Sequence, residues 1–340
     1  MSAMSKKLVL LIEILLISGI LFPKDITKVG TTSANFLKIG VGASSMGMGG
    51  AAVAVPFDAS SIYWNPSLIV DLPGGSFCAS YTNWFLDIKH SFVGVTFPVL
   101  GLGAIGGFIN LLNMGDMRVR TVELPEGTGE YFSASDMAVG VSYARKLTNF
   151  FAIGFNFKYI REQIWHCSAS SIAIDFGTIY HSDNGRYHIG ASVSNFGSKM
   201  HFTGRDLRRY YDQDPNASGD NEYIPAELHT DRWDLPLIFR VGLCVDVLKS
   251  SMLDLRMAVD AVHPNDNTEY MNLGLEMGLV KVGVLRLGYR SMFMQDSEGG
   301  LTLGGGIVWK VRNLKLNINY AYSDFGRLSY TDRIDISVIY

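Results

Sequence analysis

Cysteine is nearly absent from this 340-residue sequence, and its placement excludes two kinds of domain. Cys78, Cys167 and Cys244 stand alone within strand-like runs, and none belongs to a CxxC pair. An odd number of cysteines without paired spacing argues against a disulfide framework and against a zinc module. We therefore expect the three thiols to be small buried side chains of the main fold.

Charged and metal-binding side chains are also sparse. Asp, Glu, Lys and Arg make up 18% of the chain, below the roughly 25% of a soluble domain, and the formal net charge is −3. No polybasic stretch suggests nucleic acid as a partner. The seven histidines show no ligand spacing, so the sequence predicts no metal and no cofactor. His166 and His181 lie near serines, but no nucleophile elbow accompanies them, and we expect no enzyme activity.

Long apolar runs are missing beyond the N-terminus, which argues against membrane-spanning helices. The one candidate follows Lys6 and Lys7 and extends from Leu8 to Phe22. A basic start followed by about 15 apolar residues is typical of an export signal. Glu13 interrupts the run, and a retained N-terminal anchor is the alternative. We assign residues 1–30 to a signal peptide and a short leader.

The sequence is rich in glycine and tyrosine, with 36 and 16 residues, and it has a hydrophobic period of two. In the stretch 151–159, large apolar side chains alternate with Ala152, Gly154, Asn156 and Lys158, which is the period of a strand. A tilted strand needs roughly 9–11 residues to cross the hydrocarbon layer, and the runs have suitable lengths. A soluble β-sandwich has a similar composition. The fourteen runs lie at 76–84, 89–99, 102–112, 135–147, 150–165, 168–181, 186–196, 233–248, 252–262, 269–280, 282–294, 301–311, 314–325 and 331–340.

The length of each connector depends on whether it follows an odd-numbered or an even-numbered run. The two longest, 113–134 and 197–232, follow the third and seventh runs, so an up-and-down arrangement places both on one side. Outer-membrane barrels have long external loops and short periplasmic turns, whereas a soluble sandwich has no reason to sort its loops. We predict periplasmic termini and extracellular loops at 113–134 and 197–232. The short connectors on the opposite side are 98–101, 148–149, 182–185, 249–251 and 312–313.

The last run ends on an aromatic residue, Tyr340, with Ile334, Ile336 and Val338 on the same face. Such an ending resembles the insertion signal of bacterial outer-membrane barrels. A final strand at the end of the chain also suits a barrel in which it pairs with the first strand, so that no edge is left.

Two further motifs carry little weight. Gly101, Gly103 and Gly106 match GxGxxG, but the sequence continues as an apolar strand rather than a helix, so we do not expect nucleotide binding. The acidic stretch 212–222 begins like a calcium loop, although Pro215 and the position of Glu222 depart from that motif. A plain solvated loop is the preferred interpretation, and weak calcium binding is the alternative.

Charges of both signs recur on the polar face of the predicted strands. A charged side chain is costly in lipid, so we expect these residues to face the lumen. There they either grip an inner segment through salt-bridged packing or line a polar path, and the mixed signs favour packing. The set is Lys158, Asp175, Arg240, Asp246, Asp254, Arg256, Asp260, Glu276, Arg286, Arg290 and Lys310.

The stretch 35–66 differs from everything that follows it. It is rich in Gly, Ala and Ser, and its glycines would let the backbone pack closely against a barrel wall. Asn65-Pro66 disfavours a helix and would end the segment before the first strand. The alternative is that the whole stretch is packing and contacts no ligand. Its candidate site residues are Met46, Gly47, Gly49, Gly50, Asp58, Tyr63, Asn65 and Pro66.

This stretch resembles the N-terminal signature of the PorV/PorQ family. The sequence 43–51 is similar to the family's Met-Gly-Gly-Ala core, with Ser44 where an Arg is usual. The sequence 58–67 resembles its Asp…Asn-Pro-Ala stretch, with Ser67 in place of Ala. Further similar pieces occur at 142–145, 158–160, 194–197, 202–204 and 235–237.

The resemblance implies a FadL-like, all-β transmembrane barrel of fourteen antiparallel strands with an N-terminal plug inside the lumen. We assign the plug to residues 31–74 and the barrel to residues 75–340. The family also implies a location in the bacterial outer membrane, in contact with its lipid.

Family membership implies two possible roles. One is a type IX secretion component that binds exported proteins or partner subunits at the cell surface, with the long loops as the contact surface. The other is a FadL-like transporter of hydrophobic small molecules such as fatty acids. A charged lumen favours the first role, and an apolar pocket beside Phe36–Ile39 would favour the second. A soluble all-β binding protein is a third possibility.

Overall fold

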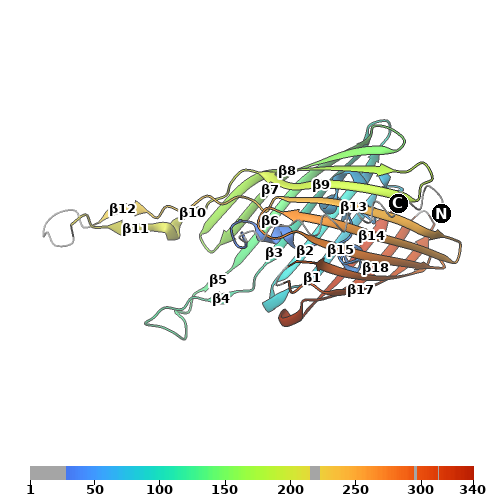
Figure 1. The fold of residues 1–340 in the computed structure, drawn as a ribbon. Coiled ribbons are helices and arrows are strands. Elements are labelled where there is room, and N and C mark those ends of the chain that lie inside the picture. Colours follow the sequence, from blue (N-terminus) through green and yellow to red (C-terminus); the bar gives the residue numbers. More distant parts are fainter. Residues whose placement is uncertain (1–27, 215–222, 295–296, 313) are drawn as a thin grey trace.

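The computed structural model describes residues 28–214, 223–294, 297–312 and 314–340, and its main feature is a sheet that closes into a barrel (Figure 1). In this part of the chain, fourteen long antiparallel strands form the wall, and the two-residue strand β10 (Thr203–Gly204) is attached to β8. The predicted fourteen-stranded antiparallel barrel is confirmed. The wall strands are β1 (Ser76–Asn83), β2 (Lys89–Val99), β3 (Gly103–Asn113), β6 (Ala134–Lys146), β7 (Phe151–Ile164), β8 (Cys167–His181), β9 (Tyr187–Gly197), β13 (Ile238–Lys249), β14 (Leu253–Pro264), β15 (Tyr270–Leu279), β16 (Gly283–Met292), β17 (Leu301–Val311), β18 (Leu314–Asp324) and β19 (Tyr330–Ile339).

The sheet has no free edge because its first and last strands pair. Ser76 of β1 lies opposite Ile339 of β19, and the register continues to Asn83 opposite Asp332. On the far side of the ring, β9 pairs with both β8 and β13. Closure satisfies the backbone N–H and C=O groups within the sheet, which the hydrocarbon layer requires.

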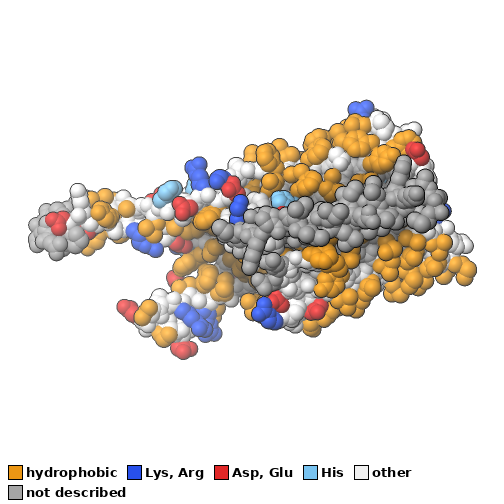
Figure 2. All heavy atoms as spheres, viewed as in Figure 1, with side chains coloured by type: hydrophobic (Ala, Val, Ile, Leu, Met, Phe, Trp, Pro, Cys, Tyr) orange, Lys and Arg blue, Asp and Glu red, His pale blue; other side chains and the backbone are white. Residues whose placement is uncertain are grey.

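Side chains alternate between two environments along each strand. In β7, Asn156 and Lys158 point inward and are buried, whereas Phe155 and Phe157 point outward and are exposed. Figure 2 shows hydrophobic side chains over the visible barrel wall and most of the charged ones on the projecting loops. The alternation follows from the pleat, because successive Cβ atoms point to opposite faces of a sheet.

The two ends of the barrel differ strongly. At the end that we call the loop end, the hairpin β4 (Met117–Arg118) with β5 (Tyr131–Phe132) and the hairpin β11 (Arg208–Tyr211) with β12 (Ile224–Glu227) project from the wall. Both hairpins lie at the left of Figure 1, and the C-terminus lies at the right. We call that opposite side the turn end, because short turns join the wall strands there. The two longest connectors therefore leave from one end of the barrel, as the parity of the runs predicts.

Three sequence expectations need comment. The strand predicted at 233–248 begins only at Ile238, because Trp233 pairs with Met200 and the Pro236 carbonyl accepts a hydrogen bond from the Asn195 side chain at 2.9 Å. Gly103 opens strand β3, so no helix follows the GxGxxG motif there. The predicted export signal at 8–22 and most of the acidic stretch 212–222 lie outside the described residues.

Residues 31–74, which we call the inner segment, run between opposite sides of the ring. The segment contains η1 (Asn35–Lys38), α2 (Ala43–Gly47), α3 (Ser61–Trp64) and η2 (Pro66–Asp71). Helix α2 contacts β16 to β19, whereas η2 contacts β3 and β6 to β8. Most of the segment is buried. None of the described helices is long and apolar enough to cross a membrane.

The close packing of the inner segment against the wall depends on small residues in the wall. A Cβ atom added to Gly177 of β8 would lie 2.0 Å from Asn65 Oδ1, whereas one added to Gly305 of β17 would have no heavy atom within 4 Å. The wall glycines at such points leave room for the segment's backbone and polar groups.

We predict that Gly177→Ala lowers the free energy of unfolding by about 1–3 kcal/mol through overpacking and makes the inner segment protease-sensitive. The measurement is the heat-modifiable shift in gel mobility together with limited proteolysis. Gly305→Ala is the matched control and should behave like the wild type. Equal behaviour of the two variants would contradict close packing at Asn65.

Candidate functional site

The residues that the sequence singled out in the inner segment bind to the wall at several places. Asn65 donates from Nδ2 to the carbonyls of Val53 at 2.8 Å and Thr178 at 2.9 Å, and its Oδ1 accepts from the Ser67 hydroxyl at 2.7 Å. Pro66 follows as the first residue of η2. Asn65 is fully buried, so these bonds fix both the turn and its contact with β8.

The glycine stretch lies against the strands opposite β8. The Thr302 hydroxyl donates to the Gly47 carbonyl at 3.2 Å, and Asn272 Nδ2 donates to the Gly50 carbonyl at 3.4 Å. Gly49 has φ +67°, and a Cβ atom there would lie 2.7 Å from the Leu273 carbonyl oxygen. Met46 is buried beside this stretch. A larger residue at Gly49 would meet both an unfavourable backbone angle and the backbone of the wall.

The aromatic end of α3 contacts a cation from the wall. The Tyr63 hydroxyl donates to the Leu37 carbonyl at 2.9 Å, and Trp64 Nε1 donates to the Val41 carbonyl at 2.9 Å. Arg240 of β13 lies 5.9 Å from the Tyr63 ring centroid and 5.7 Å from that of Trp64. These distances are within the range of cation–π contacts.

Two wall carboxylates accept hydrogen bonds from backbone groups. Asp260 Oδ2 accepts from the backbone N–H groups of Ala52 at 2.8 Å and Val53 at 3.0 Å. Asp175 Oδ1 accepts from the Asn195 N–H at 2.7 Å and pairs with Lys158 Nζ at 2.8 Å. Asp260 therefore attaches the inner segment to β14, and Asp175 holds the bend of β9.

Four of the remaining predicted charges form a belt of ion pairs across adjacent strands. Asp246 pairs with Arg256 at 2.9 Å, Arg256 with Glu276 at 3.5 Å, and Glu276 with Arg286 at 2.7 Å. Each pair is also a directly opposed register pair on neighbouring strands from β13 to β16. Arg286 Nη1 then donates to Asn319 Oδ1 at 2.9 Å. The alternating signs favour salt-bridged packing over an open polar path.

Arg290 lies apart from the belt. Its guanidinium is 5.3 Å from the Phe325 ring centroid, and Phe325 belongs to the connector after β18. Arg290 therefore contacts an aromatic residue toward the loop end rather than a carboxylate of the belt.

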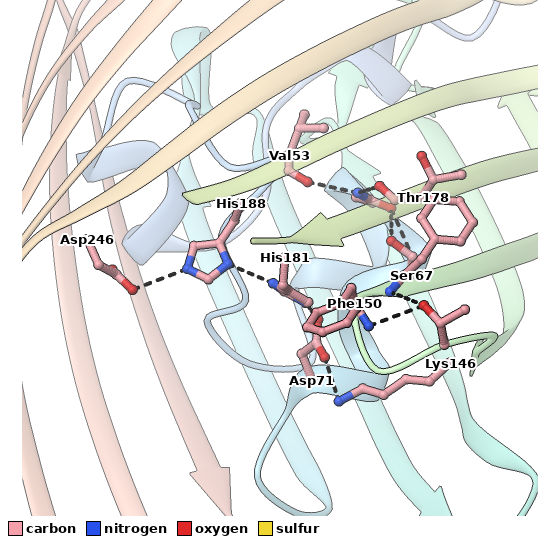
Figure 3. Close-up of polar contacts among 12 residues, drawn as sticks. Val53, Ser67, Asp71, Lys146, Phe150, Thr178, His181, His188 and Asp246 are labelled. Carbon is pink, nitrogen blue, oxygen red and sulfur yellow. Dashed lines mark hydrogen bonds and ion pairs between the residues drawn. The ribbon is translucent and has the colours of Figure 1, made fainter. Parts of the chain in front are cut away.

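A chain of imidazoles and carboxylates extends the belt to the inner segment (Figure 3). His188 Nε2 lies 3.2 Å from Asp246 Oδ2, the two Nδ1 atoms of His188 and His181 are 2.6 Å apart, and His181 Nε2 lies 2.8 Å from Asp71 Oδ2. The two Nδ1 atoms can hydrogen-bond to each other only when one of them carries a proton.

The series of imidazoles and carboxylates ends at Asp71, which forms an ion pair with a lysine of the wall. Lys146 Nζ lies 2.9 Å from Asp71 Oδ1. Burial raises the pKa of Asp71, but the hydrogen bonds from His181 and Lys146 outweigh it, so the pKa lies below its ordinary value. Asp71 lies near the end of the inner segment, and its contacts with Lys146 and His181 attach the segment to β6 and β8.

This series of imidazoles and carboxylates could not be identified from the spacing of histidines in the sequence. His181 ends β8 and His188 lies near the start of β9, and the two are opposed in register across a tight turn. The useful signal is two histidines that flank the short connector of a predicted hairpin. Asp71 gives no sequence signal, because only the fold brings it to the wall.

Another buried polar cluster lies beside β1 and β19. The ligand atoms of Asp58, Cys78 and Asp335 are within 4.8 Å of one another, and all three residues are buried. Asp335 Oδ2 accepts from the Ala43 N–H at 2.6 Å, and Asp58 Oδ1 accepts from the Ser60 N–H at 2.8 Å. Asp335 Oδ1 also accepts from Asn319 Nδ2 at 2.8 Å, so both oxygens of Asp335 have hydrogen-bond partners. Cys244 is buried in the wall and Cys167 is half-buried.

At the loop end, the two long connectors meet over the turn between β7 and β8. They enclose a groove of about 450 Å³, and we call it the loop-end groove. Trp165, at the tip of the turn, has φ +50°, and its ring lies 6.2 Å from that of Phe132 and 4.6 Å from that of His166. The lining residues are Val119, Arg120, Phe132, Ile164, Trp165, Cys167, Phe202, Asp206 and Leu207.

Solved structures of the same shape are FadL-like barrels. A Pseudomonas aeruginosa FadL homologue has a TM-score of 0.53 and 11% identity, covering 88% of this chain and 98% of that one. The Ralstonia pickettii toluene transporter TbuX has a TM-score of 0.54 and 11% identity, covering 88% and 97%. The Pseudomonas putida toluene transporter TodX has a TM-score of 0.54 and 10% identity, covering 88% and 96%. At this identity the likeness shows the fold alone.

The family is shown by the sequence itself. The family model for the type IX secretion system protein PorV matches residues 22–219, and the chain belongs to this family. No curated protein matches the sequence. The fold and the family together make this protein an outer-membrane β-barrel associated with type IX secretion.

We predict that Asp71→Asn weakens the attachment of the inner segment and lowers the free energy of unfolding at neutral pH by about 1–3 kcal/mol. Because the folded-state pKa of Asp71 is lowered, its contribution is present above the ordinary value of 3.8 and is lost as pH falls below that value. Acid titration of the heat-modifiable midpoint measures this effect. Asp183→Asn, in the exposed turn next to His181, is the control.

The two variants should give acid titration curves of different shape. The wild type and Asp183→Asn should lose stability as pH drops below about 4, whereas the Asp71→Asn curve should be flatter in that range. Parallel acid curves for all three proteins would exclude Asp71 as the titrating group.

Proposed function

We propose that this barrel is a type IX secretion component that receives exported proteins at its loop end, which faces the cell exterior. The observation that carries the proposal is the loop-end groove, which both long connectors build together over the turn between β7 and β8. The family match supports a role in secretion. Protein-binding sites concentrate their energy in desolvated aromatic and arginine residues, and Trp165, Phe132 and Arg120 provide them here.

The inner segment acts as a plug, residues 31–74, and leaves the barrel wall, residues 75–340, as a rigid base. Its hydrogen bonds to Asp260 and Thr302 on one side and to Thr178 on the other would hold it inside the lumen during binding. The wall charges would then serve to fasten the plug, and the protein would act by binding rather than by catalysis.

The groove combines apolar walls with charge at its rim. Arg205 lies 2.9 Å from His166 Nδ1, and His166 Nδ1 lies 3.1 Å from Asp206 Oδ1. The polar rim would orient a segment of an exported protein whose apolar side chain enters between Trp165 and Phe202. The positive φ of Trp165 belongs to the two-residue turn between Ile164 and Cys167, where hairpins favour this backbone conformation.

A second candidate function is the passage of hydrophobic small molecules. Phe36, Leu37 and Ile39 lie in an apolar cluster with Met200 and Leu235. Pairing of β9 with β13 stops at Ser194, and the register of β8 against β9 shifts near Phe176. An irregular wall beside an apolar interior suits a ligand route, but the cluster is closely packed by the inner segment, and we therefore favour the protein-binding role.

We predict that a photoreactive residue at Val122, which is fully exposed in the 113–134 loop, cross-links exported proteins in intact cells. Trp165→Ala in that background should reduce the cross-linked product about 30-fold, since loss of a central aromatic anchor costs about 2 kcal/mol or more. Leu328→Ala, an exposed apolar residue of η5 (Gly326–Leu328) at the same end, is the matched control and should leave the product unchanged.

The positional control is a photoreactive residue at Leu100, which is fully exposed in a turn at the turn end and should yield no exported protein. Mass spectrometry identifies the products. Recovery of lipids or fatty acids alone at Val122 would overturn the secretion role and favour the transport role.

A further inference from the structure

A second cavity, of about 420 Å³, opens at the turn end of the barrel, where the strands from β13 to β18 begin or end. The ion-pair belt from Asp246 to Glu276 forms part of its lining, and the short connectors after β15 and β17 lie at its rim. We call this cavity the basic pocket, because it also contains Lys281, Lys310 and Lys315.

The carboxylates of the belt are already engaged by other cations. Asp246 pairs with Arg256 at 2.9 Å and with Lys249 at 2.6 Å, and Glu276 pairs with Arg286 at 2.7 Å. The other carboxylate, Asp254, accepts the Ser250 N–H at 3.1 Å. Throughout the described residues, no carboxylate lies within ion-pair distance of the three lysines.

Two of these lysines are directly opposed. Lys310 of β17 and Lys315 of β18 are register partners, at the level where the strands leave the belt. Like charges directly opposite each other in a sheet are destabilising. In the belt itself every opposed charged pair has opposite signs, so the lysine pair departs from the rule that governs its surroundings.

We propose that the basic pocket binds a small multivalent anion that carries phosphate or carboxylate groups. The three ammonium groups are compact point charges, and a multivalent anion between them offsets the repulsion of Lys310 and Lys315. The volume lies within the roughly 300–1,000 Å³ of small-molecule sites. Asp254 and Glu276 also line the pocket, and like-charge repulsion would keep the anion nearer the lysines.

Membrane phospholipid headgroups offer the same phosphate chemistry. The pocket shares its lining with Asp246 and Arg256 of the lumen, so a soluble anion reaches it from the water at the turn end. The proposal is therefore a soluble anion, and a headgroup is an alternative that the experiment must separate. The basic pocket and the loop-end groove are separate sites, so the anion-binding proposal and the secretion proposal can each be wrong without the other.

The test uses the purified full chain in a nonionic detergent at low salt, with pyrophosphate as the probe. Pyrophosphate should raise the heat-modifiable midpoint of the wild type and bind in a calorimetric titration. Lys310→Met should weaken binding by about tenfold or more, the loss expected for one charge-assisted contact. Without pyrophosphate, Lys310→Met should be at least as stable as the wild type, because the opposed charge is gone.

The controls separate a built site from general attraction. Lys310→Arg keeps the charge and should retain binding. Lys89→Met removes an exposed lysine at the loop end and should match the wild type in both measurements. The proposal is wrong if pyrophosphate has no effect on the wild type, if Lys89→Met loses binding equally, or if Lys310→Met alone destabilises the anion-free protein. A shift seen only in nanodiscs with anionic phospholipid would replace the soluble anion with a headgroup.

Discussion

The constraint on which this structure depends is the closure of one sheet inside a hydrocarbon layer. Closure through β1 and β19 leaves each wall residue only two directions, toward lipid or toward the lumen. Charged side chains in the part of the wall that crosses the hydrocarbon layer are therefore directed to the lumen. The belt from Asp246 to Arg286 pairs opposite charges on adjacent strands there, and the inner segment occupies part of the lumen.

Much of the fold could be predicted from the sequence. The alternation of Phe155 and Phe157 with Asn156 and Lys158 defines a strand and its two faces. Connector length then identifies the two ends, because the two longest connectors follow strands of the same parity. The predicted start of β13 was wrong, since Trp233 lies in an apolar run yet pairs with Met200 outside the barrel wall.

The candidate sites could be predicted only in part. Charged residues of the wall are visible in the sequence as the polar half of an alternating pattern, but their partners depend on the register of neighbouring strands. The contact of His181 with His188 and Asp71 needs both a hairpin register and the path of the inner segment. The loop-end groove joins Phe132 and Phe202 from separate connectors, and no local pattern links them.

The position of the inner segment has a consequence for biogenesis. Bulky side chains such as Met46 and Trp64 lie inside a ring whose last seam is formed by β19, the final strand of the chain. Because these side chains are buried between strands of the closed ring, we expect the segment to be in place before β1 and β19 pair. The N-terminal stretch would then serve as the core around which the later strands are laid.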